Sequence, residues 1–261
     1  TKRWLIKMIW PLYRMVFKKA TFVQAISHYL AEFARAMGYM GPLEVVPNGV
    51  DSALFGRDIG EDERITLQQE LGKKESERFI ITTSRLVEKN GVEDLIMALR
   101  DLDVNIKLLV LGTGPLEEHL RLVAKKYGLG GRVRFAGHVD IKEIPKYLAV
   151  ADMFCRPSLS EGFGSSFIEA MAAGIPVIAT PVGGIVDFLF DPEQNPEKEP
   201  TGLFCAVHDP KSIAQKVQKF LSDDALRARI IVNGKKMVEE KYSWDLIARE
   251  MKEKVFNTVL S

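Results

Sequence analysis

The stretch EGFGSSFIEAMAAGIPVIA, residues 161–179, joins a glycine-bearing turn, a helix and a strand in one short segment. The run DMFCRPS (152–158) before it is mostly apolar, as a buried strand is. The segment SSFIEAMAAG has apolar residues at helical spacing and closes at Gly174, a residue suited to the end of a helix. The run IPVIATP (175–181) then predicts another strand. This order of elements is typical of a parallel α/β sheet.

The same alternation extends on both sides of this stretch. The predicted strands are 21–27, 43–48, 78–84, 106–112, 132–137, 152–158, 175–181 and 202–207. Several are continuous apolar runs, which is the pattern of strands covered on both faces. Helices are predicted between them at 93–102 and 116–128, and only helices follow residue 207. We therefore predict an α/β fold with a doubly wound parallel sheet and C-terminal helices.

The pattern divides the chain into four segments. Residues 1–42 predict a helix, a strand and a helix, a unit too small to bury its own apolar faces. Residues 43–60 pass from an extended run into PNGVDSALFGRDIG, whose proline, glycine and aspartate content is typical of a linker. Residues 61–241 hold the alternating strands and helices, and residues 242–261 predict a final helix.

Composition argues against several classes of protein. The chain has 36 basic and 35 acidic residues, a net charge of +1, so we expect no nucleic-acid partner held by phosphate contacts. Cys155 and Cys205 lie in apolar runs and have neither disulfide nor metal-ligand spacing. We expect buried free thiols in a reducing compartment, the cytoplasm. The four histidines also lack metal spacing, and no metal site is predicted.

The first twenty residues are basic and aromatic. The run from Trp4 to Phe17 is interrupted by Lys7, Pro11 and Arg14, so it predicts neither a signal peptide nor a membrane-spanning helix. We expect a helix whose apolar side packs on a sheet. Peripheral contact with an anionic surface at the inner membrane face is the alternative.

A ligand site is predicted where the helix after residue 164 begins. Helix N-termini at the carboxyl ends of parallel strands attract phosphate, because their N–H groups are free. Gly162 and Gly164 let the backbone approach a ligand closely. Glu161 in the turn and Glu169 one turn into the helix are expected to face the same cavity, where carboxylates accept hydrogen bonds from sugar or ribose hydroxyls.

Two further strand ends carry candidate residues. The segment LVLGTGPLEEHL places Gly112 and Gly114 between a strand and a helix, as a second phosphate candidate. The segment SRLVEKNGVEDL places Arg85 and Lys89 after another strand. Two cations at the carboxyl end of a strand can neutralise a diphosphate, although taken alone they would be ordinary solvated charges.

Taken together, these motifs resemble the donor-binding domain of the GT-B glycosyltransferases, with family 4 (group 1) as the nearest pattern. The resemblance covers essentially the whole chain. Its markers are AISHYLAEF, VVPNGVDSALF, SRLVEKNGVEDLI, LLVLGTGP, VRFAGHV and PSLSEGFGSSFIEAMAAGIPVIATPVGGIVDFL. Glu161 and Glu169 match the E-x7-E motif of that family, inside a context that is highly specific. The resemblance implies a Rossmann-like donor domain.

The resemblance also implies roles for the acidic pair and the turn. Glu169 would bind the ribose hydroxyls, and Glu161 would contact the transferred sugar. Backbone amides of the turn would hold the sugar and the diphosphate; these residues are Gly162, Phe163, Gly164, Ser165 and Ser166.

The remaining implied roles belong to three other segments. Arg85 and Lys89 would stabilise the leaving diphosphate, and the backbone at His138 and Val139 would lie near the base. A hinge between the domains is marked by Asn48, Gly49 and Asp51, and the first two are counted among the ligand-binding residues. The sequence departs from the family at Asn90, where a lysine is common.

In this family the reaction retains the configuration of the sugar and needs no bound metal or other cofactor. The implied partners are a UDP-, GDP- or ADP-linked sugar and an N-terminal acceptor domain. Residues 1–42 would be the last piece of that domain, 43–60 the interdomain linker, 61–241 the donor domain and 242–261 a helix returning to the acceptor domain. The chain would then be a fragment or one half of a split enzyme, and poorly active alone.

Two other functions stay open at this point. A nucleotide-sugar epimerase of the same broad fold would need acid and base residues beside the sugar, which the motif does not favour. A non-catalytic nucleotide-sugar-binding subunit is the other alternative. Arg156, next to a predicted buried strand, has no explanation in the sequence.

Overall fold

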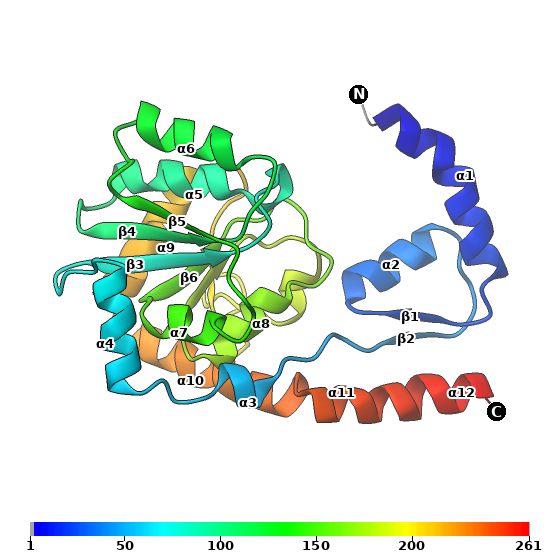
Figure 1. Ribbon diagram of the computed structural model, residues 1–261. Helices are drawn as coiled ribbons and strands as arrows, with labels where there is room; N and C mark the ends of the chain where they lie inside the picture. Colours follow the sequence, from blue (N-terminus) through cyan, green and yellow to red (C-terminus); the bar gives the residue numbers. More distant parts are fainter. Residues whose placement is uncertain (1–2, 261) are drawn as a thin grey trace.

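The computed structural model describes residues 3–260, and its main body is a six-stranded parallel sheet in the order β5-β4-β3-β6-β7-β8 (Figure 1). Its strands are β3 (Arg78–Thr83), β4 (Ile106–Leu111), β5 (Val133–Gly137), β6 (Met153–Arg156), β7 (Val177–Ala179) and β8 (Leu203–Phe204). All adjacent strands run parallel. The predicted α/β fold with a doubly wound sheet is confirmed.

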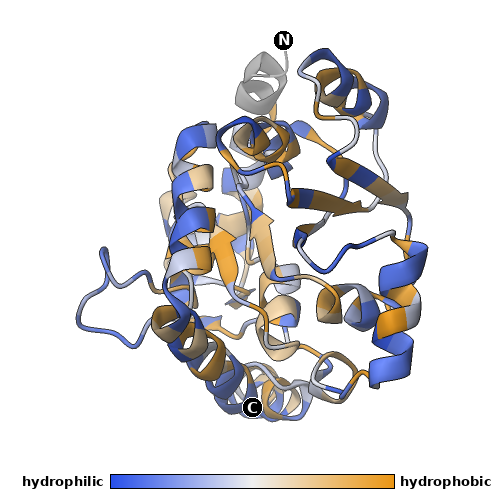
Figure 2. Cartoon of the chain, turned by 90° about the vertical axis from the view of Figure 1, so that its left-hand side faces the viewer, coloured by the Kyte–Doolittle hydropathy of each residue, from blue (hydrophilic) through white to orange (hydrophobic). Residues whose placement is uncertain are grey.

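Helices cover both faces of this sheet. One face carries α5 (Val92–Ala98), which continues as a 3-10 turn η2 (Leu99–Asp101), with α6 (Glu117–Lys126) and α9 (Pro210–Ser222). The other carries α4 (Glu61–Glu70), α7 (Ile144–Ala149), α8 (Ser165–Ala172) and most of α10 (Asp224–Lys241). Figure 2 shows the apolar strands between helices whose outer faces are hydrophilic.

Alternate residues of each strand point into two separate cores. Ile80 belongs to the core under α5, and its neighbour Ile81 belongs to the core under α8. Because neither face meets water, both sets of positions must be apolar. This explains why the strands appear in the sequence as continuous apolar runs.

A second, two-stranded parallel sheet lies apart from the main one (Figure 1). It consists of β1 (Val23–Ala25) and β2 (Leu43–Val45), with α1 (Arg3–Lys19) and α2 (His28–Ala36) beside it. Phe33 of α2 makes edge-on contacts with Trp10 and Phe17 of α1. The predicted helix, strand and helix therefore form in this order.

The segment between the two sheets is more ordered than a loop. It contains the short helix α3 (Ser52–Phe55), whose first turn is capped by Asp51 accepting a hydrogen bond from the Leu54 amide at 2.9 Å. Phe55 is buried in the core under α8. Neither α3 nor α4 was predicted. Helix α3 has only four residues, and α4 is mostly polar and buries only Leu67.

The C-terminal helix returns to the small sheet, as Figure 1 shows. It runs through α11 (Trp244–Glu250), a π-helical segment (Met251–Phe256) and α12 (Asn257–Leu260). Ile247 and Val255 form a buried cluster with Val46, which follows β2. The C-terminal helix and the small sheet are thereby packed together in one part of the molecule.

Arg132 secures the edge of the main sheet, because its guanidinium donates hydrogen bonds to the carbonyls of Ile106, Leu99, Leu102 and Asp103. Replacing it in Arg132→Met leaves those carbonyls without this donor. We expect a loss of about 2–4 kcal/mol in the free energy of unfolding. That corresponds to a melting temperature lower by roughly 5–10 °C, measured by calorimetry.

Arg134→Met is the matched control, because Arg134 is exposed and its guanidinium donates one hydrogen bond, to the Glu70 carbonyl. Its melting temperature should stay close to that of the unmodified chain. Equal losses in the two variants would contradict the role given to Arg132.

Candidate functional site

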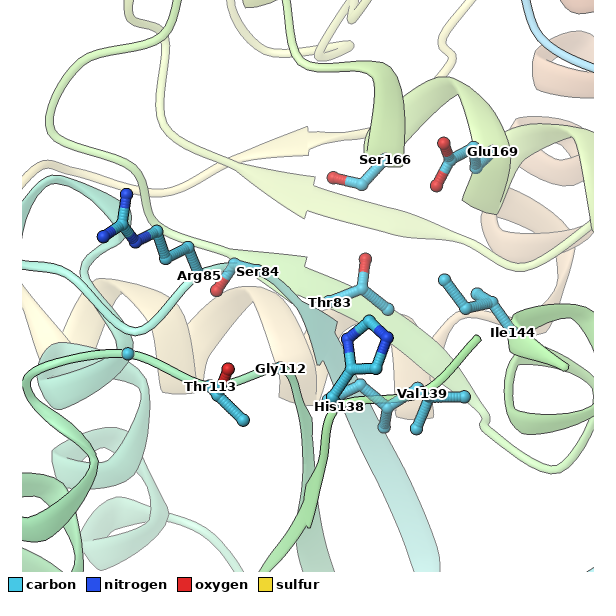
Figure 3. A pocket seen from close by; sticks show the side chains of 12 residues that line it. Thr83, Ser84, Arg85, Gly112, Thr113, His138, Val139, Ile144, Ser166 and Glu169 are labelled. Atoms are coloured by element: carbon cyan, nitrogen blue, oxygen red, sulfur yellow. The ribbon is translucent and has the colours of Figure 1, made fainter. Parts of the chain in front are cut away.

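A pocket of about 530 Å³ opens at the carboxyl ends of β3, β4 and β5, opposite the start of α8 (Figure 3). Its lining residues are Thr83, Ser84, Arg85, Leu111, Gly112, Thr113, Gly114, His138, Val139, Ile144, Ser166 and Glu169. Seven of them were predicted as site residues, from four separate segments of the sequence. Parallel strands bring these segments together because their carboxyl ends meet at one edge of the sheet.

The first turn of α8 presents its backbone amides without a side-chain cap. The cap position is Gly164, which has a φ of 103°, in the left-handed region. Ser165 and Ser166 follow it, and the Ser166 side chain lines the pocket. Free N–H groups with positive partial charge at this end favour an anionic ligand.

Glu169 lies one turn further along α8, with its carboxylate toward the pocket in Figure 3. Burial raises the pKa of this carboxyl above 4.5, and the nearby positive charge of Arg156 opposes the rise. The carboxylate is therefore held in a place where it is poorly solvated. A ligand that donates hydrogen bonds would replace the water that this carboxylate lacks.

Glu161 does not line the pocket. Its side chain is nearly buried beside it, with 13% exposed. Its Oε2 accepts a hydrogen bond from Arg156 Nη2 at 2.8 Å, and its Oε1 lies 4.0 Å from Lys89 Nζ. The same Arg156 guanidinium donates to Ser166 Oγ at 2.7 Å. Arg156 thus connects the turn that carries Glu161 with the rim of the pocket. It is the site residue that the sequence analysis did not explain.

The loop after β3 is fixed by hydrogen bonds from its neighbours. Asn90 is buried, and its Nδ2 donates to the Arg85 carbonyl at 2.6 Å. The Lys89 carbonyl accepts from the Leu159 amide at 2.7 Å. Asn90 therefore acts as a support for the loop that presents Arg85 and Lys89. The Arg85 side chain is exposed at the pocket mouth.

Gly112 and Gly114 have a packing reason of their own. A Cβ on Gly112 would overlap the Ser84 carbonyl, and one on Gly114 would overlap the carbonyl of Leu86. The loops after β3 and β4 pack backbone to backbone, so these positions admit no side chain. Both glycines also line the pocket, where a ligand could reach the same bare backbone.

Several predicted residues lie outside the pocket. Phe163 is buried against Phe188 and Tyr242, so its side chain belongs to the core and only its backbone faces the turn. Asn48 and Gly49 lie in the segment between the sheets. A Cβ on Gly49 would stand 2.6 Å from Trp244 Cδ2, which assigns this glycine a packing role. Five other predicted residues do not line the pocket either: Lys89, Glu161, Gly162, Gly164 and Ser165.

The start of α2, which lies beside the small sheet, contacts the turn directly. Ser27, buried at the start of α2, donates from Oγ to the Gly162 carbonyl at 2.6 Å. The His28 amide donates to Asp187 Oδ2 at 2.9 Å. The sequence analysis did not select Ser27, because a serine before a helix ordinarily serves as its cap, which it also does here.

Between residues 3 and 260 no group of three or more histidine, cysteine, aspartate or glutamate side chains is placed to hold a metal ion. In the same range, no helix combines the length and the apolar character needed to cross a membrane.

Residues 63–237 match the family model described as glycosyl transferases group 1. The chain belongs to this family. It is 34% identical over 210 residues to an uncharacterized glycosyltransferase of Methanocaldococcus jannaschii, covering 80% of this chain and 52% of the relative. It is 30% identical over 241 residues to the GDP-mannose-dependent alpha-(1-6)-phosphatidylinositol monomannoside mannosyltransferase of Mycobacterium tuberculosis, covering 88% and 60%. The chain thus spans between half and three fifths of the length of these relatives.

Solved structures show the same architecture. The structure of Anabaena HepE in complex with UDP and glucose has a TM-score of 0.85 and 21% identity, covering 98% of this chain and 67% of that chain. Sucrose-phosphate synthase from Thermosynechococcus elongatus has a TM-score of 0.84 and 26% identity, covering 97% and 62%. The expected GT-B fold is confirmed.

The turn that carries Glu161 packs against a 3-10 helix, η3 (Gly183–Asp187). Gly183 has a φ of 56°, and a Cβ there would overlap the Glu161 carbonyl. Gly183→Ala should therefore destabilise the chain by about 2 kcal/mol or more, through strain and displacement of the turn. The measurement is the denaturant midpoint. Gly130→Ala is the control, because a Cβ at Gly130 meets nothing within 4 Å, and it should leave that midpoint nearly unchanged.

The raised pKa of Glu169 predicts a pH-dependent cost to stability. A carboxyl whose pKa is higher in the folded state stabilises the fold only while it is protonated, and this contribution is lost as pH rises through the folded pKa. Glu169→Gln should thus raise the melting temperature at pH 7, with a gain that shrinks as pH falls through the raised folded pKa toward the ordinary value of 4.5 and is nearly absent below it. Melting temperatures across pH measure this. A gain independent of pH would contradict it.

Proposed function

We propose that this chain is the donor-binding half of a retaining glycosyltransferase, which binds a nucleoside-diphosphate sugar and transfers its glycosyl group when paired with an acceptor domain. The observation that carries the proposal is the pocket itself. Arg85, Glu169 and the amide end of α8 meet around one cavity, with Glu161 beside it through Arg156. A cation, free amides and carboxylates in this arrangement suit a diphosphate between two hydroxyl-bearing groups.

Each part of the site then has a role. The α8 amides and Arg85 bind the diphosphate and stabilise the charge that grows on it as it leaves. Glu169 accepts hydrogen bonds from the ribose, and Glu161 from the transferred sugar. Lys89, whose side chain is exposed above Glu161, adds positive charge at the leaving group. We infer that the protein residues replace a metal here, and that the leaving phosphate helps to take the proton of the acceptor.

The proposal assigns the segments outside the main sheet to the acceptor side. Residues 1–42 would be the last piece of the acceptor domain, 43–60 the linker, and 242–261 the helix that returns to it. The small sheet and the C-terminal helix share one buried cluster, which supports this grouping. Transfer requires a second domain across the cleft, so we expect the chain alone to bind donor weakly and to transfer sugar poorly.

The same proposal favours the cytoplasm. Cys155 and Cys205 are buried free thiols, which suit a reducing compartment. Exposed apolar side chains on α1, among them Trp10, Leu12 and Tyr13, lie close to the basic Arg14 and Lys18. If the protein also contacts the inner face of a membrane, this surface is the one that would do so.

Ligand-induced stabilisation tests donor binding. We expect UDP-, GDP- or ADP-linked sugars, screened separately and including GDP-mannose and UDP-glucose, to raise the melting temperature by several degrees at saturation. A ligand at 100 times its Kd adds about 2.7 kcal/mol to the native state. Arg85→Ala should reduce that shift, whereas Arg64→Ala, with an exposed cation on α4, should not. No shift with any of these donors would contradict the proposal.

Turnover distinguishes an enzyme from a binding subunit. In the longer protein, or with the acceptor domain supplied separately, Glu161→Ala and Arg85→Ala should each lower kcat by roughly 100-fold or more. A non-catalytic subunit would keep partner binding and show no such loss. An epimerase would convert the donor sugar without any acceptor, and that result would replace the proposal.

A further inference from the structure

Arg156 is a buried cation at the place where three parts of the site meet. Only 7% of the residue is exposed, and its guanidinium stacks over the Phe167 ring at 4.4 Å from the centroid. Its Nε donates to Ser158 Oγ at 3.1 Å and its Nη1 to the Thr83 carbonyl at 3.3 Å. These contacts fix the plane and direction of the guanidinium before any ligand arrives.

The other two hydrogen bonds of Arg156, to Glu161 and Ser166, orient these two side chains toward a ligand. Nη2 occupies Oε2 of Glu161, which leaves Oε1 to accept from another donor. Nη1 occupies a lone pair of Ser166 Oγ. Because Arg156 has only donors, the Ser166 hydroxyl cannot give its proton to this partner, so the proton is free to point into the pocket. One guanidinium thereby sets one acceptor and one donor for the ligand.

Stability alone gives little reason for a charge in this position. Removing an arginine from water is costly, and an apolar side chain of similar volume is often as stable or more so. Burial indeed lowers the pKa of Arg156, against the attraction of Glu161 and Glu169. Arg132, by contrast, uses its guanidinium to bind four backbone carbonyls at the sheet edge and meets no site residue.

We propose that Arg156 is a positioning residue for the sugar end of the donor: it holds the Glu161 carboxylate and the Ser166 hydroxyl in the orientations in which they contact the transferred sugar and the adjoining phosphate. This assignment rests on the proposed function. Arg156 would thereby favour binding of the nucleotide sugar over the bare nucleoside diphosphate. A ligand that lacks the sugar has no group for Glu161 to contact.

The charges around the acidic pair come from several elements. Arg156 and Lys89 face Glu161, while Glu169 shares its pocket with Arg85 and His138. The positive charge of Arg156 opposes the rise in the pKa of Glu169. Removing its charge should raise that pKa further, so that binding is lost at a higher pH as the solution is acidified.

Isothermal titration of this chain tests the assignment, with UDP against UDP-glucose and GDP against GDP-mannose. The variants are Arg156→Met, which has no charge, and Arg156→Lys, which keeps the charge but lacks the fork of donors. In both, we expect the ratio of the Kd for the nucleotide sugar to the Kd for the diphosphate to rise about tenfold. The acid limb of binding should move to higher pH in Arg156→Met and stay in place in Arg156→Lys.

Arg132→Met is the control for a purely structural arginine: it should lower the melting temperature and leave the ratio unchanged. The same behaviour in Arg156→Met, or an unchanged ratio in Arg156→Lys if the methionine variant does not fold, would overturn the assignment. If the unmodified chain binds neither these four ligands nor an ADP-linked sugar, the proposed function fails, and the assignment fails with it. A normal wild-type titration with insensitive variants rejects the role of Arg156 alone.

Discussion

Backbone contact between η3 and the turn after β6 is the constraint on which the candidate site depends. Gly183 lies against the Glu161 carbonyl with no space for a side chain, and the Gly184 amide donates to that carbonyl at 3.2 Å. The turn is thereby held in one path between β6 and α8. That path directs the free amides of α8 toward the strand ends and places the two acidic residues on either side of the helix start.

Charge at the site is concentrated where water is scarce. Arg156 and Glu161 are almost buried as a pair, and Glu169 is largely removed from solvent as well. Each charge is compensated by its neighbours more than by water, so the cluster behaves as a unit. Such an arrangement sacrifices stability that an apolar core would have provided, which is the usual mark of a site shaped for a ligand.

The two sheets are joined by more than the covalent linker. Ser27 donates to the Gly162 carbonyl, the Val50 amide donates to the Tyr242 carbonyl, and Ile247 packs with Val46. The turn that presents Glu161 is therefore in hydrogen-bond contact with the small unit. Under the proposed function, this contact links the position of the acceptor side to the donor turn.

The sequence by itself determined the sheet and most of the pocket. Continuous apolar runs indicated strands covered on both faces. Motifs at their ends selected Arg85, Gly112 and Glu169, and the family resemblance added His138; the shared edge of the sheet brings these residues together. The polar helix α4 escaped prediction because it lacks an apolar stripe. Only the tertiary structure decided the roles of Arg156, Asn90 and Ser27, which depend on partners far away in sequence or on burial. A pattern of residues records periodicity and local turns, but it does not record which atoms come within hydrogen-bond distance once the chain has packed.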